Sequence, residues 1–465
     1  MKNFTTFIKL SALICFSFLP FACAGEQNRT AAVNDAKNET KNKAASSTPG
    51  APSIGVSAPD ADAAEPAIAA APDGSGVYLV WVEHGASRAA DVYLQKFDNE
   101  AKAAGEKVRV NPQAGQATAW RGDPPTITIA ASGEIYVGWT ARVKTETASG
   151  TDLYVSVSRD GGKSFDAPAK VNDDSAPASH GMHSLAADGG GKIHVAWLDE
   201  RNIKMPAHAA NRAAEISNGF RFVKAHHTPT PEAKPMPTPQ PQPEKAEETE
   251  PNSEIFYAVS KDGAKTFSPN KKISSEVCPC CKTSLLAAGD GKVYASWRQV
   301  LPGDFRHIAV ASTADGGESF SKPAIVSDDR WQIAACPVSG AALAISPETG
   351  ALRAAWFTAG AAGKPGIYTA ESADGGKSFS ARTLINEGAA SGTPIFLARG
   401  ESVIWEAGGK LLRAGIKANQ AGQAAEITDG AMPAAVAVSN GKTFIAFSRK
   451  EGERRAVRLS VLDAF

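Results

Sequence analysis

The sequence predicts an all-β protein, a single β-propeller built from four-stranded blades. A short β-prone run that ends in an aromatic residue recurs along the chain, and a Gly, Asp or Asn turn precedes it. Regularly spaced short strands with turn signals are typical of radially repeated sheets, and long helical periodicities are absent. The recurring runs are VYLVW to Trp81, IYVGW to Trp139, IHVAW to Trp197, VYASW to Trp297, LRAAW to Trp356, SVIW to Trp405 and TFIAF to Phe447.

These seven runs favour seven blades, with six as the alternative. Each run would be the second strand of its blade, and the first strand would begin shortly before it. The expected starts lie near Pro66, Pro125, His183, Thr283, Gly340, Pro394 and Pro433.

The two ends of the propeller, residues 52–465, are expected to meet. The last unit ends in RRAVRLSVL and leaves no room for a fourth strand. The run Pro52–Val56 would supply that strand, because closing the ring removes unpaired sheet edges.

Charge balance argues against a nucleic-acid partner. The 465 residues include 49 lysines and arginines and 49 aspartates and glutamates, which gives a formal net charge of zero. A protein that binds nucleic acid normally carries a basic excess. We therefore expect no nucleic acid among the partners.

The first residues have the features of an export signal. Lys2 and Lys9 are followed by an apolar run, Leu10–Phe21, which is too short to span a bilayer. Residues Leu19–Cys23 resemble a bacterial lipobox, whose cysteine is lipidated. Residues 1–23 are therefore expected to be a lipoprotein signal with Cys23 as the lipidation site; ordinary cleavage at the same small residues is the alternative.

Two other segments are expected to lack a fixed structure. Residues 24–51 are mostly Asn, Lys, Ala, Ser and Thr, as in a solvated tether. Residues 203–253 form an insertion that contains His226, His227 and a run rich in Pro, Glu and Lys. With the lipid anchor, the tether would hold the propeller to a membrane of the cell envelope, facing the periplasm or the exterior.

One turn motif, S/T-x-D-G-x-x-S/T-F, occurs four times, at Ser158–Phe165, Ser260–Phe267, Thr313–Phe320 and Ser372–Phe379. An aspartate in such a turn accepts hydrogen bonds from nearby backbone amides, and glycine supplies a positive φ. The phenylalanine is expected to fix the hairpin onto the neighbouring sheet. The aspartates Asp160, Asp262, Asp315 and Asp374 are therefore interpreted as structural.

This motif resembles the Asp-box (BNR) repeat of sialidase-like β-propellers. The second copy departs from the repeat at Ala264, where the family has glycine. In that family the turns lie on the face away from the active site, so the resemblance places functional groups at the opposite mouth of the central channel.

Loops before the first strand and after the second strand of each blade should meet at that mouth. Ligand-binding candidates there are Trp120, Arg121, Arg142, Arg201, Arg298 and Trp331. Carboxylates that would serve glycoside chemistry are Glu83, Asp199, Glu200 and Glu406. Convergent polar and aromatic groups at a channel mouth are the usual sign of a binding site.

The resemblance also implies the groups that a sialidase needs: an arginine triad for the substrate carboxylate, a Tyr–Glu nucleophile pair and an Asp acid/base. The family's first arginine stands in the first inner strand, which here reads Glu65–Ala69. The family's nucleophilic tyrosine comes late, but no tyrosine follows Tyr368. Sialidase catalysis is therefore not the leading hypothesis.

The cysteines are the most specific detail. Aligning two units through Trp297 and Trp356 places Cys336 opposite Cys278, so these two sulfurs should lie within bridging distance. Two alternatives follow for these cysteines: disulfides, which an oxidising compartment favours, or a soft-metal site, because thiolates with imidazole or thioether ligands suit copper or zinc. The residues concerned are Cys278, Cys280, Cys281, Cys336, His180 and His183, with Met182 beside them.

Three functions follow, in order of preference. The first is a lipid-anchored propeller that binds a glycan, small molecule or protein at its channel mouth without sialidase catalysis. The second is an exo-sialidase-like glycoside hydrolase, and the third is a metal-binding or redox accessory protein of the cell envelope.

Overall fold

The computed structural model describes residues 52–85, 89–118, 123–146, 148–203, 252–333, 337–397, 400–417, 420–438 and 440–463. All of them belong to one compact unit, Pro49–Phe465, and their regular secondary structure consists of β-strands. No helix among these residues has the length and apolar character needed to cross a membrane. The expected signal, the tether and nearly all of the insertion lie outside the described residues.

Most strands pair antiparallel with the next strand along the chain and form four-stranded meanders. The first three meanders in chain order are β2 (Asp62–Ala70), β3 (Val77–His84), β4 (Ala90–Phe97) and β5 (Val108–Arg109); β7 (Thr126–Ile129), β8 (Ile135–Lys144), β9 (Ser149–Ser158) and β10 (Ala169–Lys170); and β11 (His180–Ala187), β12 (Ile193–Asp199), β13 (Ser253–Ser260) and β14 (Lys271–Val277). The next three are β15 (Ser284–Ala287), β16 (Val293–Leu301), β17 (Phe305–Thr313) and β18 (Ala324–Ile325); β19 (Ala341–Ile345), β20 (Leu352–Thr358), β21 (Gly366–Ser372) and β22 (Thr383–Glu387); and β23 (Ser391–Leu397), β24 (Ser402–Ala407), β25 (Lys410–Lys417) and β27 (Ala425–Asp429). The last meander joins β28 (Ala431–Ala437), β29 (Thr443–Glu451) and β30 (Arg454–Leu462) to the N-terminal strand β1 (Ser53–Gly55). Two short strands, β6 (Ala117–Thr118) and β26 (Gln420–Ala421), add pairs at sheet margins.

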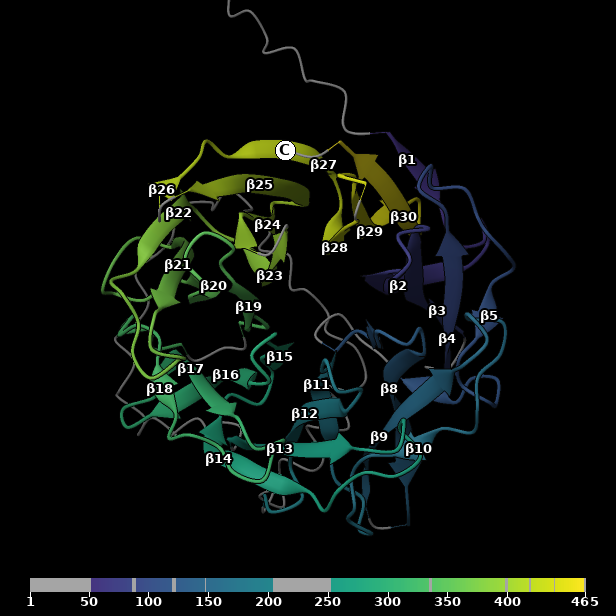
Figure 1. Cartoon of the computed structure of the whole chain (residues 1–465), viewed down its shortest axis with the longest axis horizontal. Coiled ribbons are helices and arrows are strands. Elements are labelled where there is room, and N and C mark those ends of the chain that lie inside the picture. Colours follow the sequence, from purple (N-terminus) through teal and green to yellow (C-terminus); the bar gives the residue numbers. More distant parts are fainter. Residues whose placement is uncertain are drawn as a thin grey trace, which may run out of the picture. The chain divides into compact units, whose positions relative to one another are not determined.

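The first strands of these meanders form a closed ring. Strands β2, β7, β11, β15, β19, β23 and β28 contact one another in this order, and β28 contacts β2. Figure 1 shows the sheets of this unit arranged around a common centre. The fold is therefore a β-propeller, as the sequence predicts, and the first strands surround its axis.

The ring closes through the N-terminal strand, also as predicted. In β1, Ser53 is paired with Ser460 and Ile54 with Leu459 of β30. The backbone amide of Val56 continues the pairing by donating to the carbonyl of Val457 at 2.9 Å. The first and last segments of the propeller thus share one sheet.

The aromatic residue of each second strand anchors the contact between neighbouring sheets. All seven side chains are at most 1% exposed. Strands β12 and β20 are buried along their whole length, because a second strand has a neighbouring sheet on each face. Several indoles also find a nearby acceptor for Nε1, such as the Asp199 carboxylate for Trp197 at 2.8 Å.

The four repeated turns connect the third and fourth strands of their meanders. In the turn after β17, Asp315 accepts hydrogen bonds from the backbone amide of Ser319 at 3.0 Å and the hydroxyl of Thr313 at 2.7 Å. The hydrogen bond from the Ser319 hydroxyl is the leading cause that lowers the pKa of Asp315. Phe320 packs edge-on against Tyr257 of β13 in the preceding sheet, with ring centroids 4.9 Å apart. The turn is thus self-contained and fixes one sheet to the next.

Candidate ligand cavity and cysteine cluster

A cavity of about 410 Å³ is lined by the first strands and the loops that enter them. Its wall is mainly aliphatic and proline side chains, interrupted by hydroxyl groups. Two ionisable side chains, Lys282 and Glu406, also line it. The hydroxyl-bearing residues of the wall are Thr126, Ser184, Thr283, Ser284, Ser391 and Thr393. A few polar groups on a largely apolar concave wall are typical of a small-molecule site.

Lys282 belongs to a buried polar network with Asp123 and His183. Its Nζ lies 3.6 Å from the Asp123 carboxylate and donates to the carbonyl of Pro124 at 3.2 Å. The same carboxylate is 3.0 Å from Nδ1 of His183. Burial would raise the pKa of Asp123, but His183 and Lys282 outweigh it and the pKa is lowered. Burial lowers the pKa of Lys282, which the Asp123 carboxylate opposes.

Glu406, at the other charged position of the wall, is the last residue but one of β24. Its carboxylate accepts a hydrogen bond from the backbone amide of Met432 at 3.0 Å, and the residue is 6% exposed. Met432 stands at φ 50° next to the start of β28 and lines the same cavity. The sequence offered four carboxylate candidates, all within the described residues, and Glu406 is the one of them that lines the cavity.

The other three carboxylate candidates face partners away from the cavity. Glu83 accepts two hydrogen bonds from Lys107 Nζ, at 2.7 and 2.9 Å. Asp199 is fully buried and accepts from the indole of Trp197. Glu200 accepts from the Ser253 hydroxyl at 3.4 Å. These carboxylates stabilise strand ends.

The arginine candidates do not assemble into a triad. Arg298 is fully buried and donates to the carbonyl oxygens of Ser339 and Phe357, at 2.8 and 3.1 Å. Arg201 forms an ion pair with Asp199 at 2.8 Å, and Arg142 is exposed two residues before the end of β8. None of the three lines the cavity.

The aromatic candidates are likewise not at the cavity. Trp331 is 5% exposed, and the guanidinium of Arg298 lies over its ring, 4.7 Å from the centroid. The rings of Trp331 and Phe357 are nearly perpendicular, with centroids 5.6 Å apart. Trp120 and Arg121 lie outside the described residues.

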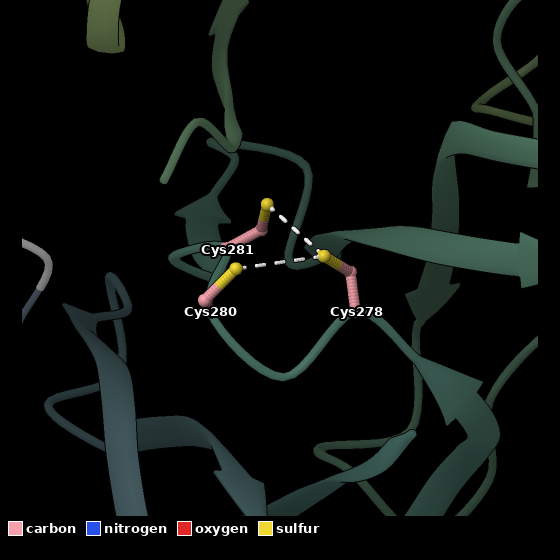
Figure 2. A group of neighbouring side chains, drawn as sticks. All are labelled: Cys278, Cys280 and Cys281. Carbon is pink, nitrogen blue, oxygen red and sulfur yellow. Dashed lines mark hydrogen bonds between the residues drawn. The ribbon is translucent and has the colours of Figure 1, made fainter. Parts of the chain in front are cut away.

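The cysteine cluster lies beside this wall, where β14 leads into β15 (Figure 2). The Sγ atom of Cys278 is 3.8 Å from that of Cys280 and 3.4 Å from that of Cys281. All three sulfurs lie within 4.8 Å of one another and could hold a metal ion. Cys278 and Cys281 are free thiols and fully buried, whereas Cys280 is not free.

A disulfide between Cys278 and Cys336 is not formed, because Cys278 is a free thiol, and its sulfur lies 3.4 Å from that of Cys281. The alignment of units used strand positions alone and ignored the tight Cys-Pro-Cys-Cys turn, in which the Cys281 amide donates to the Cys278 carbonyl at 3.4 Å. Cys336 itself lies outside the described residues.

The two histidines do not join the sulfurs. His180 places Nδ1 2.5 Å from the carbonyl of Thr151, and its Nε2 faces Asp174 at 3.2 Å. His183 is held by Asp123. Met182 packs against the cysteines within the buried core. Among the described residues, the group suited to a metal ion contains the three cysteines alone.

Positive charge surrounds the cluster. Nη1 of Arg306 donates to the Cys278 sulfur at 3.4 Å. The hydrogen bond from the Cys281 thiol is the main cause that lowers the pKa of Cys278; Arg306 and Arg298 reinforce it against burial. Burial raises the pKa of Cys281 well above its usual value. Two guanidinium groups favour a thiolate here and oppose a metal cation.

The sequence pattern around the cysteines indicates two features that an alignment of the repeated units does not reveal. Cys278 and Cys281 have C-x₂-C spacing, which is typical of redox pairs and metal ligands. Lys282 follows directly and reaches the cavity wall. Arg306 gave no signal, because it lies 28 residues from Cys278 and only strand pairing brings the two together.

No family model and none of the curated proteins matches this chain. Among solved structures, a protein of unknown function from Dyadobacter fermentans has a TM-score of 0.47 at 12% identity, covering 90% of this chain and 100% of its own. A mutant of the NanB sialidase from Streptococcus pneumoniae has a TM-score of 0.45 at 12% identity, covering 83% and 84%. An α-L-arabinanase from Penicillium chrysogenum has a TM-score of 0.44 at 13% identity, covering 73% and 92%. Because these TM-scores are below 0.5, the propeller assignment rests on the strand pairing instead.

Proposed function

We propose that this chain is an exported β-propeller protein of the cell envelope that binds a small polar ligand, such as a glycan unit, in its central cavity, without sialidase catalysis. One observation carries the proposal: the cavity wall combines several hydroxyl groups with Lys282 and Glu406. Hydroxyls, one cation and one carboxylate suit a polyhydroxylated ligand, and the apolar wall would pack against its ring face.

The internal contacts of the other candidates support the absence of sialidase chemistry. A sialidase holds a carboxylate with several convergent guanidinium groups. Here Arg298 donates to backbone carbonyls and Arg201 pairs with Asp199. Freeing either group would break existing hydrogen bonds, which are buried at Arg298 and partly buried at Arg201.

We further propose seven blades, one for each first strand in the closed ring, and a relationship of the four turns to the Asp-box repeat. The contacts of the first strands support the blade count. The shared hydrogen bonds from a Ser or Thr to the aspartate support the turn assignment; examples are Ser158 to Asp160 at 2.8 Å and Ser372 to Asp374 at 2.7 Å.

The cellular location is a separate proposal and rests on the sequence of residues 1–51. With Cys23 lipidated, the protein should fractionate with membranes, and Cys23→Ser should release it into the soluble fraction. Membrane association that persists in this variant would contradict the lipid anchor.

A binding assay tests the cavity. The full mature protein is titrated with a panel of neutral and acidic monosaccharides, and the melting temperature is followed. At least one sugar should raise Tm. In Glu406→Gln, about tenfold more of that sugar should be needed for the same rise in Tm, because one hydrogen-bonded charge is lost. Glu426→Gln is the matched control, since Glu426 pairs with Lys410 at the surface, away from the cavity.

Equal shifts in the two variants, or no shift with any sugar, would contradict the cavity proposal. A fluorogenic sialoside tests the catalytic part. Turnover above the uncatalysed rate would overturn the non-catalytic reading and favour the hydrolase alternative.

Copper or zinc at the cysteine cluster is a second candidate, which the spacing of the three sulfurs favours. The two nearby guanidinium groups and the engaged state of Cys280 weigh against it. Metal analysis of protein purified without chelator should find less than stoichiometric metal, and one equivalent of bound copper or zinc would establish the site.

A further inference from the structure

We propose that Cys278 and Cys281 form a redox-active dithiol that closes to a disulfide by exchange with an external disulfide. Cys278 is the attacking sulfur and Cys281 the resolving one. This goes beyond ligand binding in the cavity and does not depend on it.

The geometry of the two thiols suits ring closure. Both are free, both come from one tight turn, and their sulfurs are 3.4 Å apart (Figure 2). A disulfide needs an S–S distance of about 2.05 Å, which rotation of the two side chains can reach without moving the strands. In Figure 2 dashed lines join the Cys278 sulfur to the sulfurs of Cys280 and Cys281.

The surroundings make the two sulfurs unequal. Cys278 accepts hydrogen bonds from the Cys281 thiol and from Arg306, whose Nη1 is 3.4 Å away. Arg298 adds a second positive charge near both sulfurs. Within the described residues, the Arg298 guanidinium donates to the backbone carbonyls of Ser339 and Phe357, so its charge can act on a Cys278 thiolate. The thiolate is the nucleophile in exchange, which assigns the attack to Cys278.

The same surroundings disfavour a metal at this place. A cation would stand among two guanidinium groups, and Cys280 is not a free thiol that could complete the ligand set. The histidines that could help are held by Asp174 and Asp123 instead. A thiol pair that exchanges electrons has no such charge conflict.

The reaction balances with a low-molecular-weight disulfide, R–S–S–R, as oxidant. The Cys278 thiolate attacks one sulfur and expels R–S⁻, forming a mixed disulfide. The Cys281 thiol then loses its proton and attacks Cys278, expelling the second R–S⁻. The dithiol loses two electrons and two protons, and the external disulfide becomes two R–SH.

Because both thiols are buried, an external disulfide needs a route to them. Cys278 and Cys281 are 0% exposed, and Arg306, which donates to the Cys278 sulfur, is 9% exposed. A small disulfide would enter by displacement of the Arg306 side chain. Buried thiols of a purely structural kind would not react under native conditions.

The experiment uses the full mature protein in glutathione buffers of increasing oxidised fraction. After acid quenching and alkylation, the peptide that holds residues 273–282 is analysed by mass spectrometry. At high oxidised glutathione we expect Cys278 and Cys281 to escape alkylation, so that the peptide lacks two alkyl groups and a further 2 Da relative to the alkylated dithiol form. Reduced glutathione should restore both alkylation sites in full. Two free thiols that persist at every ratio in the folded protein would overturn the proposal, as would one equivalent of retained metal.

Variants assign the roles. Cys281→Ser should stop at a Cys278–glutathione mixed disulfide, and Cys278→Ser should react at least tenfold more slowly at the remaining thiol. Arg306→Met should slow closure by a similar factor, and Arg306→Lys should restore part of the rate, with circular dichroism checking the fold. Faster mixed-disulfide formation at Cys281 than at Cys278 would contradict the assignment of the attacking sulfur.

Discussion

Arg298 is an ionised side chain used as a structural element. Its guanidinium is fully buried and donates to the carbonyl oxygens of Ser339, Phe357 and Arg306. Its flat face lies over the ring of Trp331. Buried carbonyl groups left without donors are costly, so this residue joins β17, β20 and the segment before β19 at the expense of any ligand-binding role.

We predict that Arg298→Met lowers the free energy of unfolding by about 3 kcal/mol, because several buried carbonyl groups lose their donors. Arg298→Lys should recover part of this loss. Chemical denaturation measures the effect, and Arg142→Met is the control, since an exposed side chain should change stability by less than about 0.5 kcal/mol. An unchanged unfolding free energy for Arg298→Met would show that the carbonyl groups find other partners.

At the scale of the element, the repeated turn combines a hydrogen-bonded aspartate with a residue at positive φ. Gly317 has φ 93° and Gly376 φ 85° at the same position of their turns. In the second copy, Ala264 takes this position at φ 60° and is 3% exposed. The departure from glycine at Ala264 is therefore accommodated by the same turn, with backbone strain as its cost.

Two glycine substitutions separate backbone strain from steric clash. A Cβ at Gly317 would lie 2.3 Å from the ring of Tyr257, whereas at Gly376 its nearest neighbours would be 3.5 Å away. Gly376→Ala should thus lower stability by about 1 kcal/mol from strain alone, and Gly317→Ala by clearly more. Thermal unfolding compares them. Equal losses would mean that the Tyr257 ring moves away freely.

The whole molecule depends on the contact between the two ends of the propeller. Beyond the pairing of β1 with β30, Arg455 of β30 reaches into β2. Its guanidinium donates to Asp62 at 2.8 Å and to the buried Glu65 at 3.2 Å. In the core, Trp81 of β3 packs in one cluster with Phe444 of β29. Backbone hydrogen bonds, ion pairs and apolar packing therefore all stabilise the contact that closes the ring.

Deleting residues 52–57 should lower Tm and broaden the unfolding transition, because β30 becomes an exposed edge and the first and last sheets lose one tie. A deletion of residues 24–48, in the proposed tether, is the control of similar kind and should leave Tm unchanged. Differential scanning calorimetry measures both. A β1 deletion as stable as the full chain would show that the remaining contacts close the ring by themselves.

The sequence alone determined the repeat, the second-strand aromatics, the turns and the pairing of Pro52–Val56 with the last unit. These features are local or periodic: a turn forms its hydrogen bonds within eight residues, and a strand shows its burial in its own pattern. The ends of the ring could be predicted because an unfilled fourth strand has one obvious partner.

Only the tertiary structure decided which charged groups line the cavity and which sulfurs are neighbours. Arg298, Asp199 and Glu406 look alike in the sequence, since each follows a buried strand. All three have hydrogen-bond partners within the protein, but the packing of neighbouring sheets places only Glu406 of these three at the cavity wall. Cys278 meets Cys281 and Arg306 for a related reason. A tight turn and strand pairing fix their distances, and positions counted along repeated units cannot reveal either contact.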